Sequence, residues 1–235
     1  MTATKHLQGI IFDFDGVIAN SEPLHLRAFQ AVLGEEGVYF GPDEYYARYL
    51  GYDDVGLFQR LAADRGFEWN ERHVTALVAR KGVKLQELLR AGSVLFPGAA
   101  DFIRRAAEVV PIAIASGALK HEIVEIVTAA GVGTLFSTIV AAGDTAESKP
   151  SPEPYKLAFT QLRERTGLNL DPRRTVAIED SRWGLASAQG AGLRCVGVTS
   201  SYPAHELPGA ELTVAGLADL HLELLDGLCS NYRGS

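Results

Sequence analysis

The chain has 235 residues, of which 47% are apolar and 22% are charged, and its net charge is −7. This composition is typical of a globular protein with one domain or a domain with an insertion. Nucleic acid as the main partner is not expected, because a phosphate backbone is bound through clustered Lys and Arg. The two cysteines, Cys195 and Cys229, form no Cys-x-x-Cys pair, which argues against a zinc site or a disulfide scaffold.

The sequence shows no targeting or membrane segment. The N-terminal residues lack the apolar stretch of a secretory signal, and no segment reaches about 18 uninterrupted apolar residues. We therefore expect a cytoplasmic protein that does not enter a membrane. No feature of the sequence indicates a protein partner.

The first predicted element is a buried strand that ends in two acids. The apolar run Ile10–Phe12 is typical of a strand covered on both faces, and Asp13 and Asp15 follow it. Ligands gather beyond the carboxyl ends of parallel strands, so these acids are placed for chemistry. Their mutual repulsion favours a cation between them, and Mg²⁺ prefers such oxygen ligands. An acidic turn that caps a helix is the alternative for this motif alone.

A purely helical pattern follows the first strand. Asn20 or Ser21 can begin the first helix, and further helices are predicted over about 43–50, 54–65 and 71–91. Since no strand pattern interrupts them, we expect an all-helical cap domain over 19–94. It would be inserted into a core domain formed by 1–18 and 95–235. Such a cap can close over a substrate and exclude water.

Strands alternate with helices after Pro97. Strands are predicted at 109–115, 138–142, 175–178 and 194–198, and helices at 98–108, 120–130, 153–166 and 182–190. This alternation predicts an α/β fold, in which a Rossmann-like parallel sheet has helices on both faces and carries the inserted helical cap. The polar end of the chain, 226–235, is expected to form no regular structure.

Polar residues also follow the later strands of the predicted sheet. Ser116 and Gly117 offer a hydroxyl and a backbone N–H for phosphate oxygens. Lys149 lies on a proline-stiffened loop, and Glu179 and Asp180 form a second acidic pair. Each alone has an ordinary explanation as a helix cap or a solvated cation. Together with the first two aspartates, they predict a phosphoryl-transfer site.

The chemistry of such a site assigns a role to each residue type. A phosphate ester is shielded by its own negative charge, so a carboxylate nucleophile needs cations, here Mg²⁺ and Lys149. Asp13 would attack phosphorus to form an aspartyl-phosphate. Asp15 would protonate the leaving oxygen and later deprotonate the attacking water. Glu179 and Asp180 would complete the metal site, directly or through water.

These motifs resemble those of the haloacid dehalogenase superfamily of phosphohydrolases. The resemblance covers nearly the whole chain and includes the helical cap of β-phosphoglucomutase-like and phosphoglycolate phosphatase-like members. It implies Asp13 as nucleophile, Asp15 as acid/base, and Mg²⁺ bound by Asp13, the Asp15 carbonyl and Asp180. Dehalogenases of the superfamily lack the second aspartate and need no metal, so Asp15 favours phosphate chemistry. The resemblance rests on Asp13-Phe14-Asp15-Gly16-Val17, Ser116, Lys149 and Glu179-Asp180.

Three cap residues resemble substrate-binding positions of these relatives. Ser21 and His25 follow Asp13 by 8 and 12 residues, as a hydroxyl residue and a histidine do in β-phosphoglucomutase. Lys81 resembles a cap lysine that reaches the active site of those relatives. An ordinary surface histidine and a solvated helix lysine are the alternatives.

The sequence departs from the mutase at Asp53 and Asp54. Near this place the mutase carries an arginine that binds the second phosphate of a sugar bisphosphate, which acids would repel. Arg48 and Arg60 lie near enough in sequence to compensate. We therefore predict Mg²⁺-dependent hydrolysis of a small phosphomonoester, such as a sugar phosphate or a related metabolite. A β-phosphoglucomutase-type isomerase is the alternative, and an inactive regulatory module of the same fold is a third hypothesis.

Overall fold

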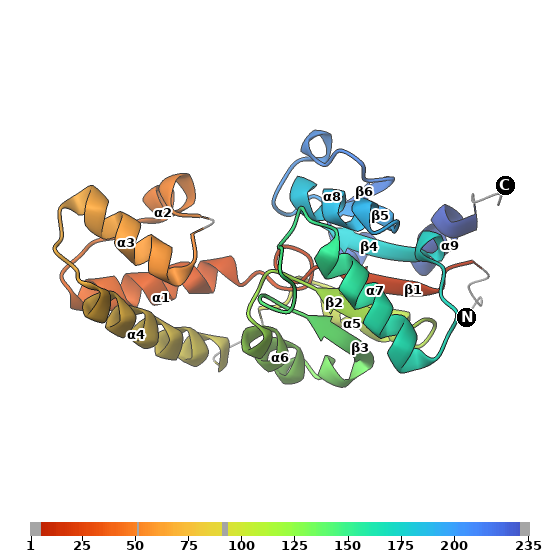
Figure 1. Ribbon diagram of the computed structural model, residues 1–235, viewed down its shortest axis with the longest axis horizontal. Helices are drawn as coiled ribbons and strands as arrows, with labels where there is room; N and C mark the ends of the chain where they lie inside the picture. Colours follow the sequence, from red (N-terminus) through yellow and green to blue (C-terminus); the bar gives the residue numbers. More distant parts are fainter. Residues whose placement is uncertain (1–5, 51, 91–93, 231–235) are drawn as a thin grey trace. The chain divides into compact units, whose positions relative to one another are not determined.

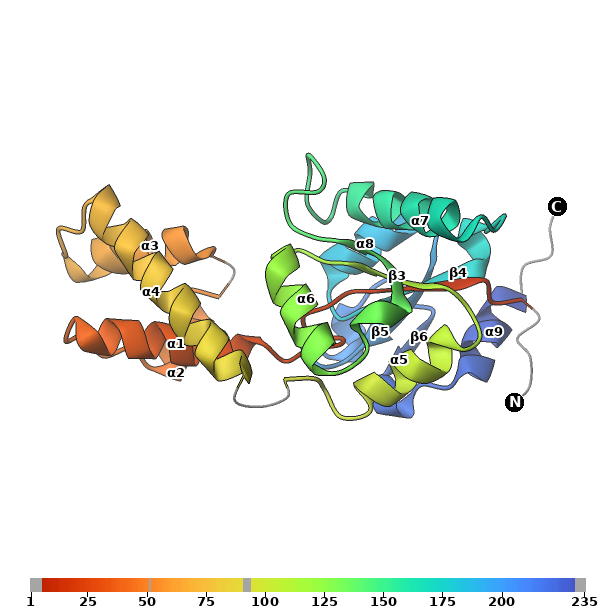
Figure 2. The same cartoon turned by 90° about the horizontal axis from the view of Figure 1, so that it is seen from below.

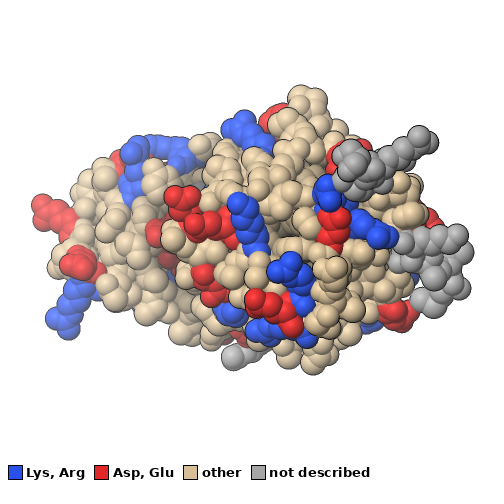
Figure 3. All heavy atoms as spheres, turned by 45° about the vertical axis from the view of Figure 1, so that its right-hand side comes forward, with Lys and Arg blue, Asp and Glu red and all other residues tan. Residues whose placement is uncertain are grey.

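The computed structural model describes residues 6–50, 52–90 and 94–230, which form two compact units (Figure 1). The core unit comprises Met1–Asn20 and Val94–Ser235, and the helical unit comprises Ser21–Ser93. Acidic and basic side chains are interspersed on the face of the molecule shown in Figure 3. That the helical unit acts as a cap remains a prediction.

The core unit contains a six-stranded parallel sheet in the order β3-β2-β1-β4-β5-β6. In its centre, Ile11 of β1 pairs with Ala113 of β2 and Ala177 of β4. Every residue of these three strands is buried, as expected for a sheet covered on both faces. The strands are β1 (Gly9–Phe12), β2 (Ile112–Ala115), β3 (Phe136–Val140), β4 (Thr175–Glu179), β5 (Arg194–Val198) and β6 (Leu212–Val214).

Helices cover both faces of this sheet, which confirms the predicted fold class. Figure 2 shows α7 and α8 on one side of the strands and α5 and α9 on the other. Tyr155 and Leu162 of α7 pack with Leu185 of α8 against the sheet residues Ile11 and Ala177. The helices of the core unit are α5 (Ala99–Ala107), α6 (Lys120–Ala129), α7 (Glu153–Thr166), α8 (Arg182–Gly190) and α9 (Leu222–Ser230).

The end of the described chain differs from the prediction. The expectation of no regular structure over 226–235 is wrong for 226–230, which belong to α9, while 231–235 lie outside the described residues. Asp226 accepts hydrogen bonds from the backbone N–H groups of His6 and Leu7, at 2.7 and 2.8 Å. Leu225 and Cys229 of the same helix are buried. This polar segment therefore contains the end of a helix. The helix contacts the start of the described chain through Asp226 and buries a narrow apolar face.

Two strands begin elsewhere than predicted, and one further strand was not predicted. β2 begins three residues later than expected, because Val110 still donates its N–H to Ala106 in the turn that ends α5. β3 begins two residues earlier, where Phe136 pairs with Ile112. β6 has three residues, too few to show a strand pattern in the sequence.

The helical unit has an aromatic core of its own. Phe29 and Phe58 meet edge to face, with ring centroids 5.4 Å apart, and Tyr45 packs against both Phe29 and Phe40. Residue 91 of the predicted helix 71–91 lies outside the described residues. Among the described residues, no helix is both long and apolar enough to cross a bilayer. The described helices of this unit are α1 (Glu22–Glu35), α2 (Pro42–Arg48), α3 (Asp54–Arg65) and α4 (Glu71–Arg90).

Candidate active site

The predicted polar residues of the core unit lie at the carboxyl ends of three central strands. Asp13 directly follows β1, Ser116 directly follows β2, and Glu179 is the last residue of β4, followed by Asp180. The pairing of β1 with β4 continues past the strand, since the N–H of Asp13 donates to the carbonyl of Ile178 at 2.9 Å. The parallel register therefore brings acids from two distant segments to one edge of the sheet.

Lys149, from the loop between β3 and α7, joins two of these acids. Its Nζ donates to Asp13 Oδ1 at 2.7 Å and to Glu179 Oε1 at 2.6 Å. Burial alone would lower the pKa of Lys149, but the carboxylates of Asp13 and Glu179 outweigh burial and raise that pKa above its usual value. Lys149 is therefore a fixed positive charge at the strand ends.

The acids nevertheless outnumber this cation. Burial, and then the charge of Glu179, raises the pKa of Asp13 well above its usual value, although Lys149 opposes the shift. Burial likewise raises the pKa of Asp180 to about 6, while a hydrogen bond from Ser201 partly offsets it. One lysine therefore does not neutralise three neighbouring carboxyl groups, and a further cation would stabilise their ionised forms.

The arrangement of the acids suits a hard cation. One oxygen each of Asp13, Glu179 and Asp180 can be chosen so that all lie within 4.8 Å of one another. Carboxylate oxygens are the ligands that Mg²⁺ prefers in proteins. Glu179 already accepts hydrogen bonds on both oxygens: Lys149 and Tyr155 donate to Oε1, and the N–H of Asp180 donates to Oε2 at 3.1 Å. This bonding favours contact of Glu179 with a metal through water.

The turn after β1 brings Asp15 and Gly16 to the same edge. Gly16 has φ +79°, a left-handed conformation that favours glycine, and its N–H donates to the carbonyl of Ala19 at 2.9 Å. A Cβ at Gly16 would lie 1.8 Å from Asp180 Oδ2, so only glycine allows this close approach. Asp15 is half-buried in this turn, two residues after Asp13.

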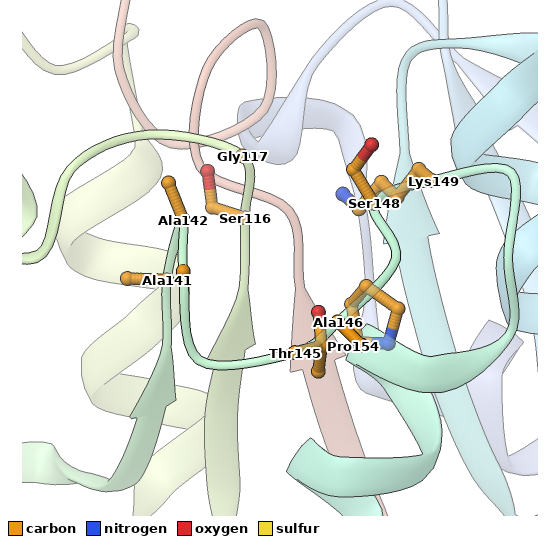
Figure 4. Close-up of a pocket in the computed structure, with 10 residues that line it drawn as sticks. Ser116, Gly117, Ala141, Ala142, Thr145, Ala146, Ser148, Lys149 and Pro154 are labelled. Carbon is orange, nitrogen blue, oxygen red and sulfur yellow. The ribbon is translucent and has the colours of Figure 1, made fainter.

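A pocket of about 280 Å³ lies between the loops that follow β2 and β3. Ser116, Gly117 and Lys149 line it together with mostly small residues, and Figure 4 shows Ser116 and Lys149 on opposite sides. The Ser116 Oγ accepts a hydrogen bond from the N–H of Ala118 at 3.0 Å, which fixes its side chain. A Cβ at Gly117 would meet nothing within 4 Å, so there is open space beside this backbone. The structure therefore brings these three predicted residues to one pocket.

The other predicted residues belong to the helical unit, where two of them meet. Lys81 Nζ lies 2.9 Å from His25 Nδ1 and donates to Asp54 Oδ1 at 2.8 Å. Lys81 is 1% exposed and its Nζ lies 4.8 Å from the centre of the Phe29 ring, so the alternative of a solvated lysine is wrong. Burial, and then the charge of Lys81, lowers the pKa of His25 to about 4. His25 is therefore neutral at pH 7.

Ser21 is buried at the N-cap position of α1, and its carbonyl accepts a hydrogen bond from the N–H of His25 at 3.1 Å. This bond places Ser21 one helical turn before the histidine. The structure brings Ser21 and His25 to the same end of α1.

Asp53 and Asp54, where the sequence differs from the mutase, have separate partners. Asp53 caps α3 by accepting a hydrogen bond from the N–H of Gly56 at 2.7 Å, and Asp54 pairs with Lys81. Arg48 and Arg60, which could take the place of the mutase arginine, both pair with Asp64, at 2.9 and 3.2 Å.

Two contacts at the strand ends carry no signal in the sequence. The Tyr155 hydroxyl donates to Glu179 Oε1 at 3.0 Å, and the Ser201 hydroxyl donates to Asp180 Oδ2. A buried tyrosine in a helix and a serine in a loop are common in any globular protein. Their role follows only from the carboxylates that they reach.

The chain is similar to known proteins over most of its length. Residues 7–192 match the family model of haloacid dehalogenase-like hydrolases. Protein CbbY of Rhodobacter capsulatus is 34% identical over 205 residues, covering 83% of this chain and 87% of that protein. Phosphoglycolate phosphatase of Yersinia pseudotuberculosis is 27% identical over 203 residues, covering 86% of this chain and 85% of that protein.

A solved structure is also similar to this chain. The crystal structure of CbbY from Rhodobacter sphaeroides in complex with phosphate has a TM-score of 0.78 and 30% identity, and the match covers 94% of this chain and 99% of that chain. These matches confirm the predicted superfamily and the predicted class of enzyme, a phosphatase. The chain belongs to the haloacid dehalogenase-like hydrolases.

Proposed function

We propose that this phosphatase depends on Mg²⁺ and hydrolyses a small phosphomonoester through an aspartyl-phosphate on Asp13. The observation that carries the proposal is the buried group in which Lys149 bonds both Asp13 and Glu179, beside Asp180. A phosphate ester repels a carboxylate nucleophile unless cations offset the charge. One fixed lysine and an acidic cluster suited to a second cation meet that requirement.

Each residue of the core unit then has a defined task. Lys149 holds Oδ1 of Asp13 and so orients the nucleophile toward phosphorus. Ser116 and the backbone at Gly117 bind phosphate oxygens in the pocket that they line with Lys149. Asp15 protonates the leaving oxygen and then takes a proton from the attacking water. That water attacks phosphorus, releases phosphate and restores the Asp13 carboxylate.

Asp13, Asp180 and the carbonyl of Asp15 would hold Mg²⁺, with Glu179 in contact through water. When bound, Mg²⁺ would supply positive charge that offsets the repulsion between the ester and the carboxylates. The close packing of Asp180 on Gly16 supports this ligand set, because it brings the two acidic loops together without side-chain obstruction.

We further propose that the helical unit is the predicted cap and that Ser21, His25 and Lys81 select the substrate. The positive charge of Lys81 is already paired with Asp54, and His25 is neutral. This balance favours a sugar phosphate or related metabolite with one phosphate. A sugar bisphosphate is the second candidate, because a CbbY mutant from Rhodobacter sphaeroides, 29% identical, was solved in complex with xylulose-(1,5)bisphosphate.

A panel of small phosphomonoesters and sugar bisphosphates, assayed for phosphate release with Mg²⁺, tests the proposal. We expect release from at least one ester, and loss of that release after chelation of the metal. Failure to hydrolyse any member of the panel would contradict the proposal and favour the inactive module. Formation of glucose 6-phosphate from β-glucose 1-phosphate, primed with a bisphosphate, would instead support the isomerase.

A further inference from the structure

The loop between β5 and β6 contacts both acidic loops of the proposed active site. The Ser201 hydroxyl donates a hydrogen bond to Asp180 Oδ2, and the neighbouring Ser200 hydroxyl donates to the carbonyl of Gly16. These partners lie 21 and 184 positions away in the sequence. Two adjacent serines of one loop therefore join the turn after β1 to the turn after β4.

Asp180 is enclosed between that loop and the backbone of Gly16. A Cβ at Gly16 would lie 1.8 Å from Asp180 Oδ2 and 3.0 Å from Ser201 Oγ. Gly16, Asp180 and Ser201 are thus in mutual contact. Asp180 is buried, and the backbone of Gly16 packs against its side chain. This packing restricts the rotamers that Asp180 can adopt.

A carboxylate that binds a metal is better prepared when its orientation is fixed beforehand. Hydrogen bonds to metal ligands from outside the coordination sphere hold the ligand oxygen in place, and their loss typically weakens metal binding about 10- to 100-fold. Ser201 makes this kind of bond to Asp180. The Tyr155 hydroxyl donates to Glu179, so both acids at the carboxyl end of β4 receive a hydroxyl from another element.

We propose that Ser201 is a positioning residue, which holds the Asp180 carboxylate in the orientation that binds the divalent cation. The inference rests on the proposed function, because it takes Asp180 as a metal ligand. Ser201 acts through Asp180 and has no contact of its own with the substrate in this account. Its removal should therefore weaken metal binding more than it lowers the rate at saturating metal.

Calorimetric titration of the full-length enzyme with Mg²⁺ tests this role without an activity readout. We expect Ser201→Ala to raise the Kd for Mg²⁺ about tenfold. Ser201→Thr keeps a hydroxyl and should restore most of the affinity, while Asp180→Ala sets the loss expected when the ligand itself is removed. At saturating Mg²⁺, kcat of Ser201→Ala should recover to within about twofold of the wild-type value.

Thr199→Val is the matched control from the same loop. Thr199 Oγ1 donates to the carbonyl of Val214 at 3.3 Å, away from the acids, so this change should leave the Kd for Mg²⁺ unaltered. An unchanged Kd in Ser201→Ala would overturn the positioning role, as would an equal rise in Thr199→Val. Absence of Mg²⁺ binding by the wild-type enzyme would instead refute the proposed metal site, and the role of Ser201 with it.

Discussion

The two units of this protein each bury a lysine against acids, but the charge around the two lysines differs. Lys149 of the core unit bonds Asp13 and Glu179, while Lys81 of the helical unit bonds Asp54 and a neutral His25. The first cluster therefore has more acids than cations, and the second is balanced. An excess of buried carboxylates raises their pKa values unless a further cation offsets the charge, whereas a balanced pair needs no such cation. This difference supports the proposals that the core unit carries the phosphoryl chemistry and that the helical unit recognises the substrate.

The largest effect is expected from removing the nucleophile. Asp13→Asn keeps the size of the side chain and a hydrogen-bond acceptor for Lys149, but an amide does not form the aspartyl-phosphate. We expect kcat for phosphate release to fall by about 10³-fold or more, with little change in the unfolding midpoint. Steady-state assays and urea unfolding measure the two quantities. Hydrolysis at the wild-type rate would show that another group attacks phosphorus.

Replacing each buried lysine by methionine tests the contrast between the clusters. Lys149→Met should lower kcat by about 10²-fold, because the ammonium group that offsets the negative charge of the phosphate is lost. It should also destabilise the protein by about 3 kcal/mol, since buried acids lose their cation. In Lys81→Met the side chain of Asp54 is 32% exposed and can be hydrated, so we expect a smaller loss, about 1 kcal/mol.

For the lysine pair, urea unfolding gives the two stabilities, and kinetic assays with the best substrate give kcat and KM. Lys81→Met should change KM more than kcat, as expected for a residue that contributes to recognition. Equal losses of kcat in the two variants would break the contrast between the units.

Asp54→Asn is expected to alter substrate preference. The change leaves the charge of Lys81 without its carboxylate partner, so a second phosphate should be better accepted. We expect the ratio of kcat/KM for a sugar bisphosphate over the corresponding monophosphate to rise about tenfold, equivalent to about 1.4 kcal/mol. Asp53→Asn is the matched control, because Asp53 caps α3 and does not bond Lys81. A ratio that shifts equally in both variants would contradict this account.

The last prediction concerns stability alone, which should depend on pH through His25. The pKa of His25 is lowered from 6.5 to about 4, first by burial and then by Lys81. The unfolded chain therefore binds a proton between these pH values that the folded chain does not bind. The stabilising contribution is present above pH 6.5 and is lost as the pH falls through 4.

The stability of His25→Gln should consequently fall less steeply than that of the wild type between pH 6.5 and 4. Urea unfolding at several pH values gives the free energy of unfolding of each protein. Subtracting one curve from the other removes the contributions of the groups that the two proteins share. Parallel curves for the two proteins would show that His25 titrates alike in the folded and unfolded states.

The strand-end residues could be predicted because each stands where an apolar run stops. Asp13, Ser116 and Asp180 follow such runs, and the parallel register of the sheet brings their segments together. Lys149 could be predicted from its place after the next strand. In each case a local pattern and a rule of α/β topology suffice.

The remaining contacts depend on pairings that no local pattern encodes. Lys81 meets Asp54 across 27 residues, and Ser201 meets Asp180 across the β5–β6 loop. The pairing of Arg48 with Asp64 was likewise not encoded by any local pattern. The docking of α9 through Asp226 could not be predicted for the same reason, since its partners lie at the start of the described chain.

The nucleophilic role of Asp13 is tested most directly by rapid quenching of the enzyme during turnover of its best substrate with Mg²⁺, followed by mass spectrometry of its peptides. We expect a transient phosphoryl group on the peptide that contains Asp13, and none in Asp13→Asn. Turnover without any phosphorylated Asp13, or a phosphoryl group on another side chain, would contradict this role.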